Sequence, residues 1–182
     1  MNRIHGVIAA AIFAAIASPA CADPVFAAFT KVCADTRADF SAVTAAANAN
    51  GWKKSDSAGD TTMEGVDVSD RLTRASKIGD SEVTLFAWRG MTRKGVQVSA
   101  CTMHVAKSAF AEVQQDAAAW TGFAAQDAGP TNALYRFSDA PEGRHALAKS
   151  DYDTAAAGPG MEILTVSTDG HGAILDLLKI KK

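Results

Sequence analysis

The sequence has no excess of positive charge and little cysteine. Its 182 residues include 18 Lys and Arg against 20 Asp and Glu, which gives a formal net charge of −2. Nucleic acids and anionic membranes attract basic surfaces, so this balance argues against either of them as the main partner. The sequence contains three cysteines, and none belongs to a Cys-x-x-Cys motif of the redox-active kind. The apolar fraction of 48% is high enough for a folded core.

The sequence also lacks an apolar run of the roughly 20 residues that a membrane-spanning helix requires. The longest run, residues 7–17, follows Arg3 and precedes a Ser-Pro-Ala-Cys-Ala segment. A basic start, about ten apolar residues and small residues at the end of the segment are typical of a secretory signal peptide. Because Ala20 and Ala22 occupy the small-residue positions, we expect cleavage between Ala22 and Asp23.

This interpretation divides the chain into a signal peptide, residues 1–22, and a single globular domain, residues 23–182. It places the mature protein in the periplasm or outside the cell, without an integral membrane span. Two alternatives stay open, namely a membrane-anchoring helix and lipidation of Cys21. The apolar run is short for the first, and the residues before Cys21 lack the Leu-Ala-Gly-like pattern that lipoprotein processing prefers.

Cleavage after Ala22 leaves Cys33 and Cys101. An even number of cysteines in an oxidising compartment predicts one disulfide bond between them. In the chain-entropy model, closing a loop of about 70 residues stabilises the fold by about 4 kcal/mol. The alternative is a pair of buried, unpaired thiols.

Residues 81–106 have the pattern of a β-hairpin. Apolar and β-branched residues alternate with period two on both sides of a polar tip that contains Gly95. Neither face of the hairpin is entirely polar, so we expect it in the middle of a sheet. Cys101 lies on its second strand.

Three helices are expected. Asp23 can cap the first, with Pro24 at its first position, and Cys33 lies on its apolar face. The second begins at a capping-box-like segment, residues 36–39, and ends at residues 50–51. The third spans residues 107–122 and should bury Phe110, Val113 and Trp120 on one stripe.

Further strands are expected around Leu72 and over residues 134–137, 144–149, 161–167 and 173–180. Helices followed by strands, then a helix and more strands, predict an α+β fold. We expect an antiparallel sheet with helices packed on one face and one disulfide.

Cys33 on a helix, the Gly51-Trp52 pair and Cys101 on a later strand together resemble small exported proteobacterial proteins of unassigned function. The resemblance covers mainly the first third of the chain. It implies export and carries no activity with it.

Common catalytic signatures are absent. The sequence has no Gly-x-Ser-x-Gly, no His-Glu-x-x-His, no phosphate loop and no dinucleotide fingerprint. His104, His145 and His171 are far apart, which is unlike the spacing of a typical zinc site. We therefore assign no catalytic, cofactor-binding or metal-binding residue and expect no cofactor.

One segment partly matches a calcium loop. Asp151, Asp153 and Glu162 occupy its positions 1, 3 and 12, but Ala155 and Ala156 stand where a ligand and a glycine are needed. A solvated acidic loop is the simpler interpretation.

The chain ends in Lys179, Lys181 and Lys182. These lysines are explained either by an edge strand protected by charge or by a small basic docking patch.

The leading functional hypothesis is a non-enzymatic binding or interaction module, whose partner is a protein, an envelope component or a small ligand. The alternative is a small periplasmic hydrolase that uses His104 or His145 with an Asp and assembles its site only in the fold. A pocket holding a histidine, a carboxylate and a Ser or Thr within hydrogen-bond reach would favour the enzyme. A broad exposed apolar patch would favour the binding module.

Overall fold

A computed structural model describes residues 23–56, 64–158 and 160–182. The expected signal peptide, residues 1–22, lies outside the described residues, as does Ala22 of the expected cleavage site. The elements in chain order are α1 (Pro24–Phe29), the π-helical turn η1 (Thr30–Ala34), α2 (Phe40–Ala49), β1 (Lys53–Lys54), β2 (Val66–Ile78), β3 (Ser81–Thr92), β4 (Gln97–Ala106), α3 (Phe110–Thr121), β5 (Asp127–Ala128), β6 (Asn132–Ala140), β7 (Gly143–Ala146), the 3₁₀ turn η2 (Lys149–Asp151), α4 (Tyr152–Ala157), β8 (Met161–Thr168) and β9 (Gly172–Lys181).

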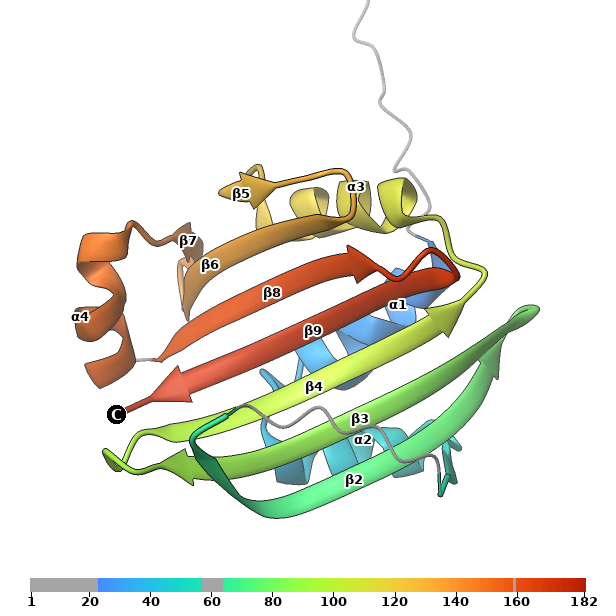
Figure 1. Cartoon of the computed structure of the whole chain (residues 1–182), viewed down its shortest axis with the longest axis horizontal. Coiled ribbons are helices and arrows are strands. Elements are labelled where there is room, and N and C mark those ends of the chain that lie inside the picture. The colour runs from blue at the N-terminus through green and yellow to red at the C-terminus, as the bar shows by residue number, and fades with distance from the viewer. Residues whose placement is uncertain (1–22, 57–63, 159) are drawn as a thin grey trace, which may run out of the picture.

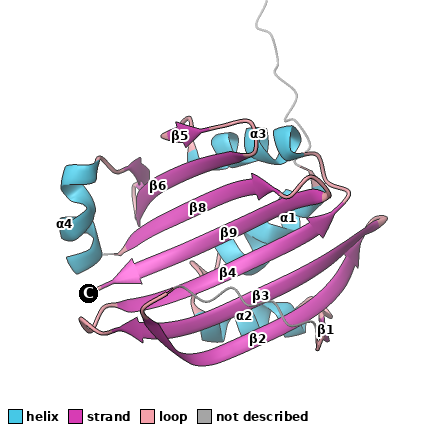
Figure 2. Ribbon diagram, in the orientation of Figure 1, coloured by secondary structure: helices cyan, strands magenta, loops and turns pink. Residues whose placement is uncertain are grey.

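The strands form one antiparallel sheet in the order β1-β2-β3-β4-β9-β8-β6-β5, with β7 paired to β6. Helices α1, α2 and α3 all lie behind this sheet in Figure 1, and α4 lies at its side near the C-terminus. Figure 2 shows the same division between a helix-covered face and a face that these three helices leave open. The predicted α+β fold, with helices packed on one face of an antiparallel sheet, is confirmed. The hairpin of β3 and β4 lies inside the sheet, as expected.

The strand order is symmetric about the boundary between β4 and β9. On one side β4, β3 and β2 follow each other outwards, and on the other β9, β8 and β6 do the same. Each set of three follows helices in the sequence, because α1 and α2 precede β2 and α3 precedes β6. The fold therefore repeats a helix-and-three-strand unit that has no clear repeat in the sequence.

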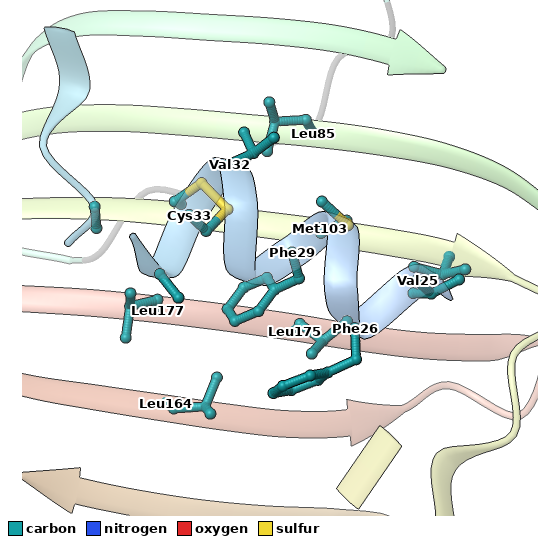
Figure 3. Close-up of a cluster of buried hydrophobic side chains, with 14 of the residues drawn as sticks. Val25, Phe26, Phe29, Val32, Cys33, Leu85, Met103, Leu164, Leu175 and Leu177 are labelled. Atoms are coloured by element: carbon teal, nitrogen blue, oxygen red, sulfur yellow. A yellow bond between two sulfur atoms is a disulfide. The ribbon is translucent and has the colours of Figure 1, made fainter. Parts of the chain in front are cut away.

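The main core lies between the sheet and the helices. Residues of α1 and η1 such as Phe29 and Val32 pack against strand residues such as Met103, Leu175 and Leu177 (Figure 3). All five side chains are fully buried or nearly so. Burial of one such side chain is worth about 1.5–3 kcal/mol, so this layer fixes the helices on the sheet.

The predicted disulfide is present. Cys33 in η1 and Cys101 in β4 are bonded, with their Cα atoms 5.4 Å apart, and both residues are fully buried. Figure 3 shows the bond within the apolar layer. It joins two positions 68 residues apart and so links the N-terminal helices to a central strand.

The expected capping box at residues 36–39 is wrong. Asp39, not Thr36, caps α2, and its side chain accepts a hydrogen bond from the amide of Ala42 at 2.9 Å. The hydroxyl of Thr36 donates backwards to the carbonyl of Val32 at 2.8 Å, so it is not available to the next helix. A π-helical turn ends before this point, and the chain then reverses through residues with positive φ.

The third helix has the expected bounds, but its apolar stripe is only partly enclosed. Val113 is fully buried, whereas Phe110 and Trp120 are half-buried. The Trp120 ring packs edge-on against Phe137 at 5.7 Å, and the guanidinium of Arg144 lies 3.6 Å from the ring centroid. The expectation of burial is therefore wrong for two of the three residues, because Phe110 and Trp120 lie at the outer part of the stripe, where Trp120 is covered by a charged side chain rather than by the core.

Candidate functional site

A cavity of about 530 Å³ lies on the helix-covered side of the sheet, where the N-terminal end of α2 leaves the ends of four strands uncovered. Its walls come from α2, β2, β3, β4 and β9. The lining residues are Asp39, Phe40, Asp67, Ser69, Arg89, Gly90, Met91, Gln97, Val98, Ser99, Lys179 and Lys181.

The wall from β2 and β3 depends on a close approach of the two backbones. The register between them shifts between Val68 and Asp70, which is a β-bulge at Ser69. A Cβ atom on Gly90 would lie 2.4 Å from the carbonyl oxygen of Asp67, so only glycine fits opposite this segment. The hydroxyl of Ser69 donates to the backbone carbonyl of Arg89 at 3.3 Å. The sequence thus shapes this wall through one bulge and one glycine.

The floor is crossed by a row of four charged residues and one serine, which pair in register across five strands. In strand order they are Asp70, Arg89, Ser99, Lys179 and Glu162. The two acids stand at the ends of the row and the two cations stand inside it, on either side of the small Ser99. At one end, Nε of Arg89 donates to Asp70 at 2.7 Å. At the other, the Glu162 carboxylate accepts from Nε of Arg37 at 2.8 Å.

The roof is the start of α2. The guanidinium carbon of Arg89 lies 5.5 Å from the centroid of the Phe40 ring, a cation–π contact that holds the arginine under the helix. Immediately before Asp39 and Phe40, Arg37 and Ala38 have φ values of 53° and 51°. Two consecutive non-glycine residues in the left-handed region cost free energy, and such strain concentrates at functional sites.

The two lysines of the lining, Lys179 and Lys181, unlike Arg89, have no carboxylate within ion-pair distance among the described residues. Burial lowers the pKa of half-buried Lys179, and the nearby Arg37 guanidinium lowers it further, while Glu162 acts in the opposite direction. Burial also raises the pKa of Glu162, which is 1% exposed, against the opposing effect of Arg37.

The edge-strand interpretation of the C-terminal lysines is wrong. β9 lies between β4 and β8, so it is an interior strand. Lys179 and Lys181 face the cavity on the helix side, whereas Lys182 lies beyond the strand and pairs with Asp153. The lysines therefore do not protect a sheet edge.

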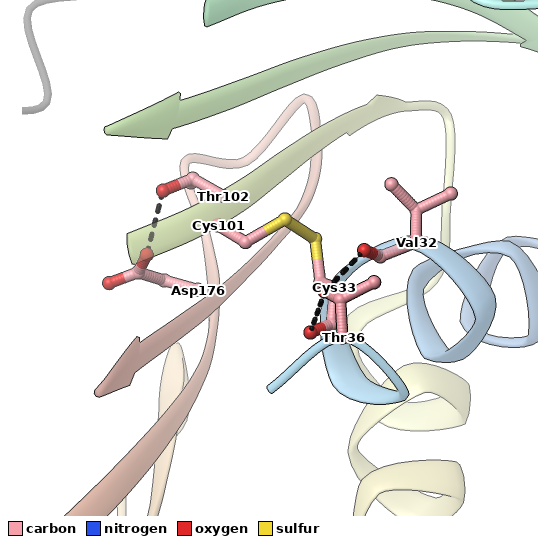
Figure 4. The surroundings of a disulfide bond; sticks show 6 residues. All are labelled: Val32, Cys33, Thr36, Cys101, Thr102 and Asp176. Atoms are coloured by element: carbon pink, nitrogen blue, oxygen red, sulfur yellow. Dashed lines mark hydrogen bonds between the residues drawn. A yellow bond between two sulfur atoms is a disulfide. The ribbon is translucent and has the colours of Figure 1, made fainter. Parts of the chain in front are cut away.

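His104, one of the two histidines named for a hydrolase site, lies on the opposite face of the sheet. His104 on β4 packs its ring edge-on against Phe86, with the centroids 5.4 Å apart. Beside it, the Thr102 hydroxyl donates to the Asp176 carboxylate at 2.7 Å. Figure 4 shows Cys101 and Thr102, neighbours on β4, pointing to opposite faces. Burial lowers the pKa of His104 and raises that of Asp176.

A smaller cavity of about 240 Å³ adjoins His104, and its other polar lining residues include Glu82, Thr84, Asp169 and His171. Across the described ranges, no hydrogen bond joins a histidine side chain to a serine, a threonine or a carboxylate.

The remaining candidates are dispersed. His145 is exposed on the short strand β7, with its Nε2 3.7 Å from Glu142. Within the part of the chain that the structure describes, no three His, Cys, Asp or Glu side chains come together as a metal site. Asp151 and Asp153 belong to η2 and α4, while Glu162 binds Arg37, so the calcium-loop arrangement is not formed. Of the helices in the described segments, none has the length and apolar character to cross a membrane.

The motifs and periodicity of the sequence did not predict this cavity, although the strand patterns carry a signal for it. On β3, β4 and β9 the helix-facing positions are apolar along most of the strand and then turn polar at one end. They end in Arg89, in Ser99 and Gln97, and in Lys179 and Lys181. Since the three strands are neighbours, these ends meet at one place. Finding it required the strand order, which the sequence does not supply.

No family model, no curated protein and no solved structure matches this chain.

Proposed function

We propose that the mature chain is an exported binding module and that the cavity between α2 and the strand ends is its ligand site. A cavity of about 530 Å³ falls in the range typical of small-molecule sites. The observation that carries the proposal is the change from apolar to polar and cationic residues at helix-facing positions of three neighbouring interior strands, around a concave surface. Of the three candidate partners, a small ligand fits this cavity best.

The energetics support a site rather than a structural cluster. Lys179 is half-buried and forms no ion pair with any described residue, and partial burial of an unpaired ammonium group costs free energy. Arg37 and Ala38 add backbone strain beside the same cavity. Destabilising features of this kind concentrate where binding uses them.

Export is the part of the proposal that rests on residues 1–22 and on the disulfide. A buried disulfide such as Cys33–Cys101 forms and persists in an oxidising compartment, which is compatible with the periplasm or the cell exterior. Mass analysis of the exported protein tests this directly. A chain that begins at Asp23 supports export with cleavage, and a retained N-terminus or a lipid on Cys21 contradicts it.

The binding claim is tested by native mass spectrometry of protein purified gently from the envelope fraction. We expect a bound small molecule on the wild type. Ser99→Tyr, which fills the cavity floor, should lose it, and Thr84→Tyr, which fills the smaller cavity on the opposite face, should retain it. The proposal fails if the adduct survives Ser99→Tyr in a folded protein or is lost in Thr84→Tyr.

A hydrolase is the second candidate, because His104 and Asp176 lie on adjacent strands of the open face beside a cavity. Turnover of a panel of model esters and peptides should then be lost in His104→Ala and kept in Lys179→Gln. The opposite pattern would place the activity in the larger cavity.

A further inference from the structure

We propose that the larger cavity binds a small organic monocarboxylate. In this arrangement the ligand carboxylate lies over Ser99, between Arg89 and Lys179, and its apolar body lies against Phe40 and Met91. The inference rests on the proposed function and specifies the chemistry of the ligand.

The first argument is the geometry of the charged row. Arg89, Ser99 and Lys179 are in register on three neighbouring strands. At a spacing of about 4.8 Å per strand, the Cα atoms of Arg89 and Lys179 are about 10 Å apart, with the small serine between them. This separation suits one carboxylate held between two long cationic side chains.

The second argument is the supply of free donors. Arg89 uses Nε for Asp70. In the described chain no hydrogen bond engages its two Nη groups or the Ser99 hydroxyl, and no ion pair engages the Lys179 ammonium. A carboxylate accepts hydrogen bonds from a guanidinium in a bidentate manner and from hydroxyl and ammonium groups at its remaining lone pairs.

The third argument is the charge of the lining. The cations are Arg89, Lys179 and Lys181, and the lining acids are Asp39 and Asp67. The cations exceed the lining acids by one, and Asp70 offsets part of the charge on Arg89. The lining residues alone carry a formal excess of one positive charge, which matches a ligand with one negative charge better than the two charges of a phosphate monoester.

The fourth argument is the apolar wall. Within the described ranges Met91 is the one large apolar side chain that is exposed, at 47%, and it lies on the lining beside the cations. Phe40 contributes the face of an aromatic ring that is half-buried. A ligand with an apolar body would cover both, which a small inorganic anion would not do.

The test is calorimetric titration of the oxidised mature protein, residues 23–182, with three probes that each contain eight carbon atoms. Octanoate should bind, octanamide should bind at least tenfold more weakly, and octyl phosphate should also bind more weakly than octanoate. Equal binding of octanoate and octanamide would overturn the proposal, because the cations would then play no part. Tighter binding of octyl phosphate would overturn the assignment to a monoanion.

Variants then locate the carboxylate. Lys179→Gln should weaken octanoate binding at least tenfold, while Lys182→Gln, on the same chain end but outside the cavity, should leave it unchanged. Asp67→Asn removes a lining negative charge and should tighten binding several-fold, a gain that a merely damaged protein would not show. Unchanged affinity in both Lys179→Gln and Asp67→Asn would overturn the proposal.

The inference and the proposed function fail in different ways. If the native adduct depends on Ser99 but octanoate does not bind, the cavity is a ligand site and the monocarboxylate assignment is wrong. If the adduct persists in the Ser99→Tyr variant, the proposed function itself is wrong.

Discussion

Lys179 and Glu162 stand opposite each other across the pairing of β9 and β8, yet the Glu162 carboxylate is bound by Arg37 instead. Arg37 reaches it from the segment between η1 and α2, with Nε of Arg37 2.8 Å from the carboxylate and its Nη2 donating to the carbonyl of Asp139 at 3.2 Å. Because the acid is already neutralised, Lys179 remains available on the cavity side. This relationship is the structural basis of the proposed anion site.

Glu162 predicts a pH dependence of stability. Burial raises its folded-state pKa above the usual value near 4.5. Its contribution to stability is then fully present below the unfolded pKa and is lost as pH rises through the folded pKa. The free energy of unfolding of wild type, minus that of Glu162→Gln, should therefore fall as the pH rises above about 4.5. Urea unfolding of both proteins at several pH values measures this difference.

The control for this experiment is Glu82→Gln, because Glu82 is exposed on β3. The Glu162→Gln difference should fall by more over this pH range than the control difference does. A Glu162→Gln difference as flat as that of the control would show that burial of the carboxylate does not perturb its protonation.

The Cys33–Cys101 bond should dominate stability. Replacing either cysteine with serine should cost about 2–5 kcal/mol, and replacing both should cost little more, because one bond is lost in every case. Urea unfolding measures the loss, and thiol titration of the denatured, unreduced protein checks the bond itself. Two titratable thiols per chain would refute it.

The left-handed segment predicts an unusual response to glycine. Ala38 is fully buried with φ of 51°, where an L-residue costs about 1–2 kcal/mol. Ala38→Gly relieves this cost, but glycine gains more chain entropy on unfolding, which offsets part of the relief. The net effect should range from neutral to stabilising by about 1 kcal/mol. Ala47→Gly, at a buried position within α2, should destabilise by about 1 kcal/mol or more. Equal destabilisation by the two changes, measured by thermal unfolding, would contradict the strain.

Processing should create an ion pair. The backbone nitrogen of Asp23 donates to the Asp116 carboxylate at 2.8 Å. If cleavage exposes Asp23, this nitrogen becomes an ammonium group, and Asp116→Asn should then cost up to about 1 kcal/mol in the mature chain. The same change should cost less when the N-terminus is acetylated. Unfolding free energies of the two forms near pH 6.5 decide the matter, and identical losses would contradict the pairing.

Most of the fold was predictable because it depends on local pattern. The period-two alternation of residues 81–106 gave the central hairpin, and Asp23 with Pro24 gave the start of α1. Cys33 on an apolar helix face and Cys101 on a strand gave the disulfide. Each of these is a property of neighbouring residues or of a single pair.

The site was not predictable in the same way. The helix-facing ends of β3, β4 and β9 meet because β9 pairs with β4, which requires knowledge of a long-range contact. The lysines of β9 consequently suggested a protected edge, although the strand is interior. The reversal at Arg37 and Ala38 was missed as well, because no glycine marks the positive φ values.

The most direct test of the ligand site uses the methyl groups of methionine as reporters in protein labelled with [ε-¹³C]methionine. Met91 lines the cavity, whereas Met103 is buried in the core, and Met161, also buried, neighbours α4 and the C-terminal end of the chain. The Met91 signal is assigned by its loss in Met91→Leu. Saturating octanoate should shift the Met91 signal along a binding curve and leave those of Met103 and Met161 in place. A binding curve carried by Met161 with Met91 unmoved, or no saturable shift of Met91, would contradict the cavity as the site.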